Sequence, residues 1–164
     1  MNIIFLDIDG VIVLNNHEID LSPASEVEKQ FLNDTNWKWR LREIRSINPI
    51  AVGLINRLAK ETGSQIVLSS DWRKYDTIGD IESLLKFHGL GVEIIGKTPV
   101  IMGPRGREIQ NWLDETWLDI DKFVIIDDRD DMDKVKPFLV KTDWNIGFTT
   151  QQLFNQAKDI LQGK

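Results

Sequence analysis

Short apolar runs alternate with helical patterns along most of the chain. Asn2–Leu6, Gln65–Leu68 and Phe123–Ile126 are too short for helices and rich in β-branched residues, so they predict buried strands. We expect further strands at Gly91–Ile95 and Phe138–Val140. Apolar strands that alternate with helices indicate a parallel sheet covered on both faces. The predicted fold class is therefore α/β, with a doubly wound, Rossmann-like sheet of about five strands.

Three segments between these strands have helical periodicity. Pro49–Thr62 begins after a potential cap at Asn48 and ends before Gly63. The second predicted helix runs from about Ile78 to His88, and the third follows Gly106. Because ligands bind beyond the carboxyl ends of the strands in such sheets, we look for chemistry directly after each strand.

An insertion interrupts this alternation between the first strand and its helix. Residues 14–48 are about 35 residues long, which exceeds an ordinary connection, and we predict a small helical cap there. Ser22–Pro23 starts a predicted short helix, and Trp37, Leu41 and Ile44 follow a helical stripe. The residues after Trp37 also alternate as in a strand, so both interpretations are open. Residues 1–164 are expected to form a single domain that contains this cap.

Composition narrows the possible functions. The chain has 164 residues, 41% of them hydrophobic, and it has no cysteine, which excludes disulfide scaffolds, thiolate zinc sites and cysteine nucleophiles. No apolar run approaches the ~20 residues of a membrane span, and the first residues lack a signal-peptide pattern. We expect a cytoplasmic protein without a membrane partner. The net charge of −6 disfavours sequence-blind coating of nucleic acid but leaves a local basic groove possible.

Carboxylates follow two of the predicted strands. Asp7 and Asp9 come after the first strand, and alternation points both side chains the same way. Asp127 and Asp128 follow the strand Phe123–Ile126. Converging carboxylates repel one another unless a cation lies between them, and hard oxygen ligands suit Mg²⁺ better than Zn²⁺. The sequence therefore predicts a magnesium site.

Phosphate-binding groups follow other elements. Ser69 and Ser70 offer hydroxyls after the second long strand, and Arg105 and Arg107 lie at the start of a helix, where anions are favoured. Together with the carboxylates, these groups indicate phosphoryl transfer through an aspartyl-phosphate. In that chemistry one aspartate attacks phosphorus and a second carboxyl moves the proton of the leaving group.

The segment Phe5–Val11 resembles motif I of the haloacid dehalogenase (HAD) superfamily of phosphohydrolases, and Ile125–Asp128 resembles motif IV. The resemblance covers nearly the whole chain, with the motifs in the expected order. It implies that Asp7 is the nucleophile and that Asp9 is the general acid and base. It also implies that the metal is held by Asp7, Asp127 and Asp128 and by the backbone carbonyl of Asp9. The phosphate-binding hydroxyl would be Ser69 or Ser70, and the motif III cation would be Arg105 or, alternatively, Arg107 or Lys97.

A finer similarity is to the small-cap or capless phosphatase modules of polynucleotide kinase/phosphatase and of RNA-repair proteins. The segments that carry it are Ile47–Pro49, Gln65–Val67, Ser70–Arg73, Arg105–Ile109 and Asp127–Arg129. This similarity implies a phosphomonoester substrate on a nucleotide or at a nucleic-acid end, as in a 3′-phosphatase. A phosphoprotein or small-metabolite phosphatase is the alternative within the same fold.

Cations and tryptophans of the predicted cap and of motif II are candidate substrate contacts. The stretch from Trp37 to Arg45 has four cationic side chains and one acidic side chain, with two tryptophans between them. Such a stretch suits single-stranded nucleic acid, although an amphipathic element with buried tryptophans has the same pattern. The predicted substrate contacts are Arg40, Arg42, Arg73, Lys97 and Arg107.

One sequence match suggests a different class of protein. Gly91–Thr98 fits the P-loop formula, which would indicate a nucleotide kinase or nucleotide-binding module. Its middle residues predict a strand, and Pro99 and Pro104 oppose a helix directly after Lys97. We therefore expect no P-loop.

Overall fold

A five-stranded sheet with the strand order β3-β2-β1-β4-β5 forms the centre of the molecule, and all its strand pairs are parallel. The structure is a computed structural model that describes residues 1–15, 20, 22–32 and 37–164. The central strand β1 pairs in register with β2 and β4 over its whole length. The strands are β1 Asn2–Leu6, β2 Ser64–Leu68, β3 Ile94–Lys97, β4 Lys122–Asp127 and β5 Leu139–Lys141.

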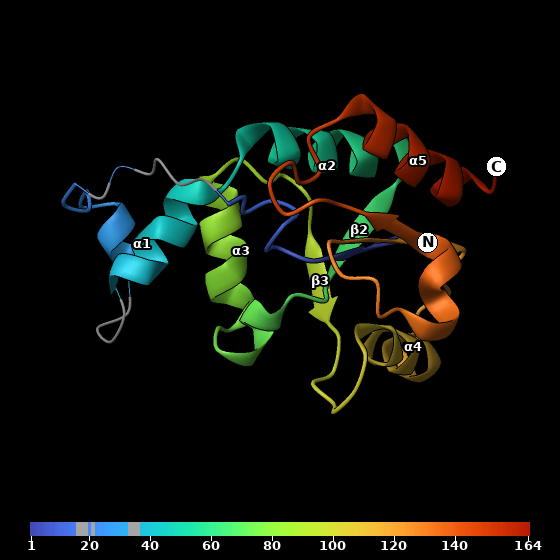
Figure 1. Cartoon of the computed structure of the whole chain (residues 1–164). Helices are drawn as coiled ribbons and strands as arrows, with labels where there is room; N and C mark the ends of the chain where they lie inside the picture. The colour runs from blue at the N-terminus through green and yellow to red at the C-terminus, as the bar shows by residue number, and fades with distance from the viewer. Residues whose placement is uncertain (16–19, 21, 33–36) are drawn as a thin grey trace.

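Helices cover both faces of this sheet (Figure 1). The helices are α1 Trp37–Ser46, α2 Pro49–Thr62, α3 Ile78–Phe87, α4 Arg105–Glu115 and α5 Gln151–Gln162, with short 3₁₀ helices η1 Glu28–Phe31, η2 Asp71–Lys74 and η3 Asp133–Phe138. Side chains of α2, α3 and α5 pack on one face, and side chains of α4 and η3 pack on the other. The doubly wound α/β architecture predicted from the sequence is confirmed.

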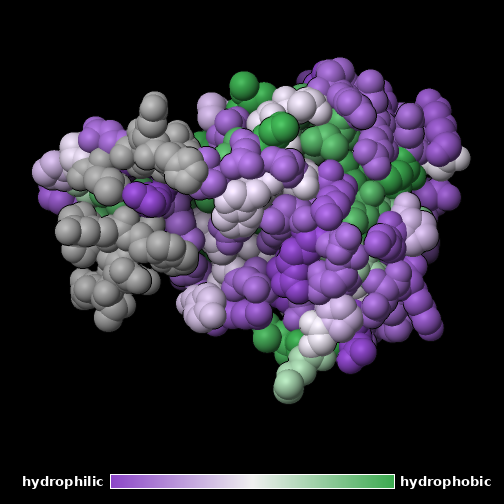
Figure 2. Space-filling view, viewed as in Figure 1, coloured by the Kyte–Doolittle hydropathy of each residue, from purple (hydrophilic) through white to green (hydrophobic). Residues whose placement is uncertain are grey.

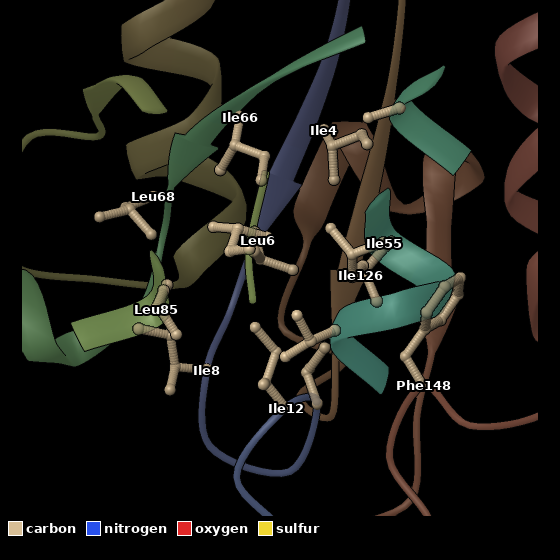
Figure 3. Close-up of a cluster of buried hydrophobic side chains, with 14 of the residues drawn as sticks. Ile4, Leu6, Ile8, Ile12, Ile55, Ile66, Leu68, Leu85, Ile126 and Phe148 are labelled. Carbon is tan, nitrogen blue, oxygen red and sulfur yellow. The ribbon is translucent and has the colours of Figure 1, made fainter. Parts of the chain in front are cut away.

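Alternation along β1 divides the core between these two faces. Ile4 and Leu6 are fully buried against the α2 side, where Ile55 and Phe148 also lie (Figure 3). Phe5 is fully buried on the α4 side. Burying both faces of the strand explains why its sequence has no polar alternation.

The predicted helix boundaries largely agree with the structure. The Asn48 side chain accepts hydrogen bonds from two backbone amides of the first turn of α2, and Gly63 ends the helix with a φ of 64°. Helix α3 ends one residue before the predicted His88, and α4 already begins at Arg105. These ends are encoded locally, which is why the sequence reveals them.

Other elements differ from the prediction. Strand β3 begins at Ile94, three residues later than predicted, because the amide of Gly91 is hydrogen-bonded to Asn56 of α2 outside the sheet. Strand β5 begins at Leu139, since Phe138 belongs to η3. Helix α5 was not predicted, although Thr150 caps its first turn through a bond from the Leu153 amide.

The insertion between β1 and α2 contains η1 and α1. A helix does form over Trp37–Ser46, so the strand interpretation of this stretch is wrong, and the only helical element described before it is η1, which starts at Glu28 instead of Ser22. Residues 16–19, 21 and 33–36 lie outside the described residues. Figure 1 shows η1 and α1 at one end of the molecule, next to α3.

Hydrophilic side chains cover most of the described surface in the view of Figure 2. Among the described residues, no helix has the length and apolarity that crossing a bilayer requires.

Candidate active site

The first strand delivers two carboxylates to the carboxyl edge of the sheet. The amide of Asp7 continues the ladder with a 3.1 Å bond to the Ile126 carbonyl, and the chain then turns, with Ile8 buried below. Gly10 lies in this turn with a φ of +70°, and a β-carbon there would lie 2.8 Å from Cβ of Asp128. Glycine thus lets the turn approach the second acidic pair closely.

Arg105 joins the two acidic strand ends. Its Nη1 lies 3.1 Å from Oδ1 of Asp7 and 2.9 Å from Oδ2 of Asp127, and its Nη2 lies 3.3 Å from Asp71. The residue is 2% exposed. Burial lowers the pKa of the guanidinium, but the charges of Asp7 and Asp127 raise it by a larger amount. The net shift is upward, so Arg105 stays charged.

A close contact brings Arg105 to this position at the start of α4. A β-carbon on Gly106 would lie 2.1 Å from the Met132 carbonyl oxygen, so only glycine allows the helix to pack this tightly on the loop after β4. The amide of Gly106 also donates a 3.0 Å bond to the Asp131 carbonyl. Of the three predicted motif III cations, Arg105 is the one that pairs with Asp7 and Asp127 among the described residues.

Three carboxylates form a group that could hold a metal ion. Asp7, Asp127 and Asp128 each offer one oxygen, and these oxygens lie within 4.8 Å of one another. Burial, followed by the charge of Asp7, raises the pKa of both Asp127 and Asp128. A divalent cation would relieve this repulsion, and an all-oxygen ligand set suits Mg²⁺. The side chain of Asp9 lies outside this group, which leaves the backbone carbonyl as its predicted metal contact.

Asp9 has the properties of a proton-transfer group. Burial and the charge of Asp7 raise the pKa of Asp9 to about 6, although a hydrogen bond from Trp72 lowers it. The Trp72 Nε1 donates this bond to Oδ2 of Asp9 over 2.9 Å. A carboxyl with a pKa near neutrality can both give and take a proton at neutral pH.

The two serines after β2 have different surroundings. Ser70 Oγ accepts a 3.4 Å bond from the Trp72 amide and caps η2. Ser69 Oγ is fully buried and has no hydrogen-bond partner among the described residues. A buried hydroxyl without a partner costs free energy unless a ligand completes it. This difference favours Ser69 as the phosphate-binding hydroxyl.

The comparisons with known proteins agree with this geometry. A model of the HAD domain in Swiss Army Knife RNA repair proteins matches residues 3–153. The chain belongs to this family of HAD domains. No curated protein and no solved structure matches the chain. Family membership confirms the resemblance to HAD phosphohydrolases and supports a phosphatase function.

Arg73 has an internal role in this HAD domain, in place of the predicted contact with substrate. Its guanidinium donates to the carbonyls of Ser69, Ser70 and Thr98 and forms an ion pair with Glu108. The residue is 2% exposed. The sequence shows a cation next to motif II, but it does not show the backbone oxygens that surround it.

The two predicted substrate contacts in the insertion, Arg40 and Arg42, have different surroundings. Arg40 is buried and pairs with Glu43 at 3.3 Å and with Asp76 at 3.1 Å, so it is not free to bind polymer phosphates. Its guanidinium also stacks over the ring of Trp72, 4.5 Å from the centroid. Arg42 is exposed and borders a pocket beside Asp9. The side chains of residues 37–39, which include both tryptophans of this stretch, lie outside the described residues.

Within the described part of the chain, neither Lys97 nor Arg107 pairs with a carboxylate of the site. Lys97 is on the edge strand β3 and donates a 3.2 Å bond to the Arg73 carbonyl, and Arg107 is exposed, with a long 3.5 Å contact to the Met102 carbonyl. The P-loop alternative is excluded by the same region, because β3 occupies the middle of Gly91–Thr98 and the next helix starts only at Arg105.

Two polar residues near the site were not predicted. Thr142, directly after β5, donates a 2.8 Å bond to the Gly10 carbonyl and so supports the turn that contains Asp9. Glu108 holds both Arg73 and the Ile101 amide. The sequence signal for Thr142 was its place directly after a strand, but β5 is so short that this signal was weak. For Glu108, only its place on the first turn of α4 hinted at a role.

Proposed function

We propose that this HAD domain is a magnesium-dependent phosphomonoesterase that acts through a phosphorylated Asp7. The observation that carries the proposal is Arg105, which bridges Asp7 and Asp127 at the carboxyl edge of the sheet. This arrangement gives a nucleophilic carboxylate a cation that can also bind the oxygens of a phosphoryl group. The unpaired Ser69 hydroxyl supplies a further donor.

The reaction would proceed in two steps. A carboxylate oxygen of Asp7 attacks phosphorus, the bond from phosphorus to the leaving oxygen breaks, and Asp9 gives that oxygen its proton. Asp9 then takes a proton from a water molecule that attacks the same phosphorus, which breaks the bond to Asp7 and releases inorganic phosphate. Asp7, Asp127 and Asp128 would hold Mg²⁺, whose charge allows an anionic nucleophile to approach a phosphate dianion.

We propose the phosphate at a nucleic-acid end, and in particular a 3′-phosphate, as the substrate. The family description names RNA repair proteins, which supports this class of substrate. A phosphoprotein or a small phosphorylated metabolite would need the same carboxylates and the same Arg105, so the chemistry of the site does not separate them. The substrate class is therefore tested by comparing phosphate release from each class of substrate.

The experiment is phosphate release from matched oligonucleotides with a 3′- or a 5′-phosphate, from nucleoside monophosphates, from a phosphoserine peptide and from an aryl phosphate. Each is measured with Mg²⁺ and with a chelator, and Asp7→Asn is the control for contaminating phosphatases. Release that needs Mg²⁺, needs Asp7 and prefers the 3′-phosphate supports the proposal. Release from the peptide alone contradicts the nucleic-acid substrate, and release that persists in Asp7→Asn contradicts the nucleophile.

A further inference from the structure

A pocket of about 210 Å³ opens beside Asp9, between the insertion and the loop that follows β5. Arg42 and Glu43 of α1 line it on one side, and Trp144 lines it from the loop. We propose that this pocket binds the nucleoside that is released from the phosphate, with the base against Trp144 and the neighbouring phosphate of the chain against Arg42. This inference rests on the proposed phosphatase function and adds to it the site of the leaving group.

The position of the pocket supports this assignment. In an in-line displacement the leaving oxygen lies opposite the attacking oxygen of Asp7 and next to the acid that protonates it. Asp9 lines the pocket, whereas Asp7 and Arg105 are not among the described residues that line it. The pocket is therefore on the leaving-group side of phosphorus.

The size of the pocket fits part of a substrate. Pockets that enclose a whole drug-sized ligand usually measure ~300–1,000 Å³, so about 210 Å³ accommodates a single ring system. The carboxyls of Asp9 and Glu43 can accept hydrogen bonds from the hydroxyls of a sugar. A ribose in the pocket would leave its base at the rim.

Trp144 and Arg42 provide what a base and a phosphate need at this rim. Trp144 is 45% exposed, so part of its indole is open for stacking, and such stacking tolerates every base. Arg42 is exposed, and none of the described residues forms an ion pair with it. In a chain with a net charge of −6, this exposed cation beside the acidic site is suited to a phosphate of the polymer.

The test uses the product, an oligonucleotide with a 3′-hydroxyl, because it contains the leaving group without the phosphate. Its dissociation constant is measured for the unmodified protein, for Trp144→Ala, Trp144→Phe and Arg42→Gln, and for two controls. The controls are Trp117→Ala, a 90% exposed tryptophan in another pocket, and Lys122→Gln, at the amino end of β4.

We expect Trp144→Ala to weaken binding roughly tenfold and Trp144→Phe to retain most of it, because a phenyl ring still stacks. Arg42→Gln should weaken binding and reduce the slope of log affinity against log salt by about one. The controls should bind as the unmodified protein does. Equal binding by Trp144→Ala and the unmodified protein, or equal losses in Trp144→Ala and Trp117→Ala, would overturn the inference.

Hydrolysis separates this inference from the proposed function. In Trp144→Ala, kcat/KM for a nucleoside 3′-phosphate should fall about tenfold more than kcat/KM for glycerol phosphate, which has no base. Equal falls for both substrates would indicate a structural role for Trp144 and contradict the pocket assignment. If the unmodified protein releases phosphate from neither substrate, the phosphatase proposal fails, whereas the binding series still decides the role of Trp144.

Discussion

The indole nitrogen of Trp72 donates a 2.9 Å hydrogen bond to Oδ2 of Asp9, although 63 positions separate the two residues in the chain. The guanidinium of Arg40, in α1, lies over the ring of the same tryptophan. The insertion therefore contacts the proposed general acid through one tryptophan. The bond stabilises the charged carboxylate and lowers the pKa of Asp9.

Replacing Trp72 should shift the pH dependence of catalysis. In Trp72→Phe the hydrogen bond is lost, so the pKa of Asp9 should rise above its value of about 6. Because Asp9 must be protonated to assist the leaving group, the fall of kcat/KM on the alkaline side should move to higher pH. The check is a pH profile of both proteins, with Trp112→Phe, which changes a partly buried tryptophan packed against the core on the α4 side, as the control. An unshifted profile would show that the bond does not tune Asp9.

Asp7→Asn should remove activity without unfolding the protein. Asparagine has nearly the same shape but is a poor nucleophile, so we expect a loss of at least about a thousandfold in kcat. Removing the charge of Asp7 also removes the repulsion that, second to burial, raises the pKa of Asp127, while Arg105 keeps its ion pair with Asp127. Thermal unfolding without Mg²⁺ should therefore occur at the same or a higher temperature than in the unmodified protein. Full turnover in a folded variant would rule out Asp7 as the nucleophile.

Arg105→Gln should destabilise the fold, and more so at high pH. The variant leaves buried Asp127 without its 2.9 Å partner, which typically costs about 3–5 kcal/mol. The raised pKa of Asp127 means that it becomes neutral as pH falls, so the loss should be smaller at pH 5 than at pH 8. Urea unfolding at both pH values measures this. Arg107→Gln, two residues further along α4 at an exposed position, is the matched control.

Glu43 should make stability depend on pH. Burial is the main cause that raises the pKa of Glu43 from 4.5 to about 8 in the folded protein. A raised folded-state pKa gives stability that is present below pH 4.5 and is lost as pH rises to about 8. Glu43→Gln should therefore flatten the decline of unfolding free energy across this window. Urea titrations from pH 5 to 8 test this, and exposed Glu115→Gln should retain the decline.

Mg²⁺ should stabilise the folded protein through the carboxylate group. A cation that binds only the native state stabilises it by RT ln(1 + [L]/Kd), so the unfolding temperature should rise with the logarithm of the free Mg²⁺ concentration once this exceeds the dissociation constant. We expect this increase to be lost in Asp128→Asn and kept in Asp130→Asn, which changes an exposed neighbour outside the group. If both variants respond alike, the ion binds elsewhere.

The sequence predicts those parts of the molecule that local rules determine. The strand before Asp7, the cap of α2 at Asn48 and the end of this helix at Gly63 depend on neighbouring residues, and all are found as expected. The convergence of Asp7 and Asp127 also follows from sequence, because parallel strands end at the same edge of a sheet.

Features that depend on tertiary contacts could not be predicted in the same way. The partners of Arg73 are mainly backbone carbonyls, which any sequence would offer, and only the fold places them around its guanidinium. The sequence makes Arg40 a candidate contact for nucleic acid, but it does not show that the fold places Glu43 and Asp76 beside this side chain. The choice between Ser69 and Ser70 likewise depends on which hydroxyl the backbone of η2 uses.

The buried guanidinium of Arg73 connects three segments that surround the proposed phosphate site. It ties the end of β2, the segment after β3 and the first turn of α4 to one another through Ser70, Thr98 and Glu108. The groups proposed to hold the phosphoryl oxygens are therefore preorganised, and ordering them would consume little of the binding free energy. Discrimination between leaving groups would then depend on the insertion and on the loop of Trp144, which border the site without taking part in this fixed network.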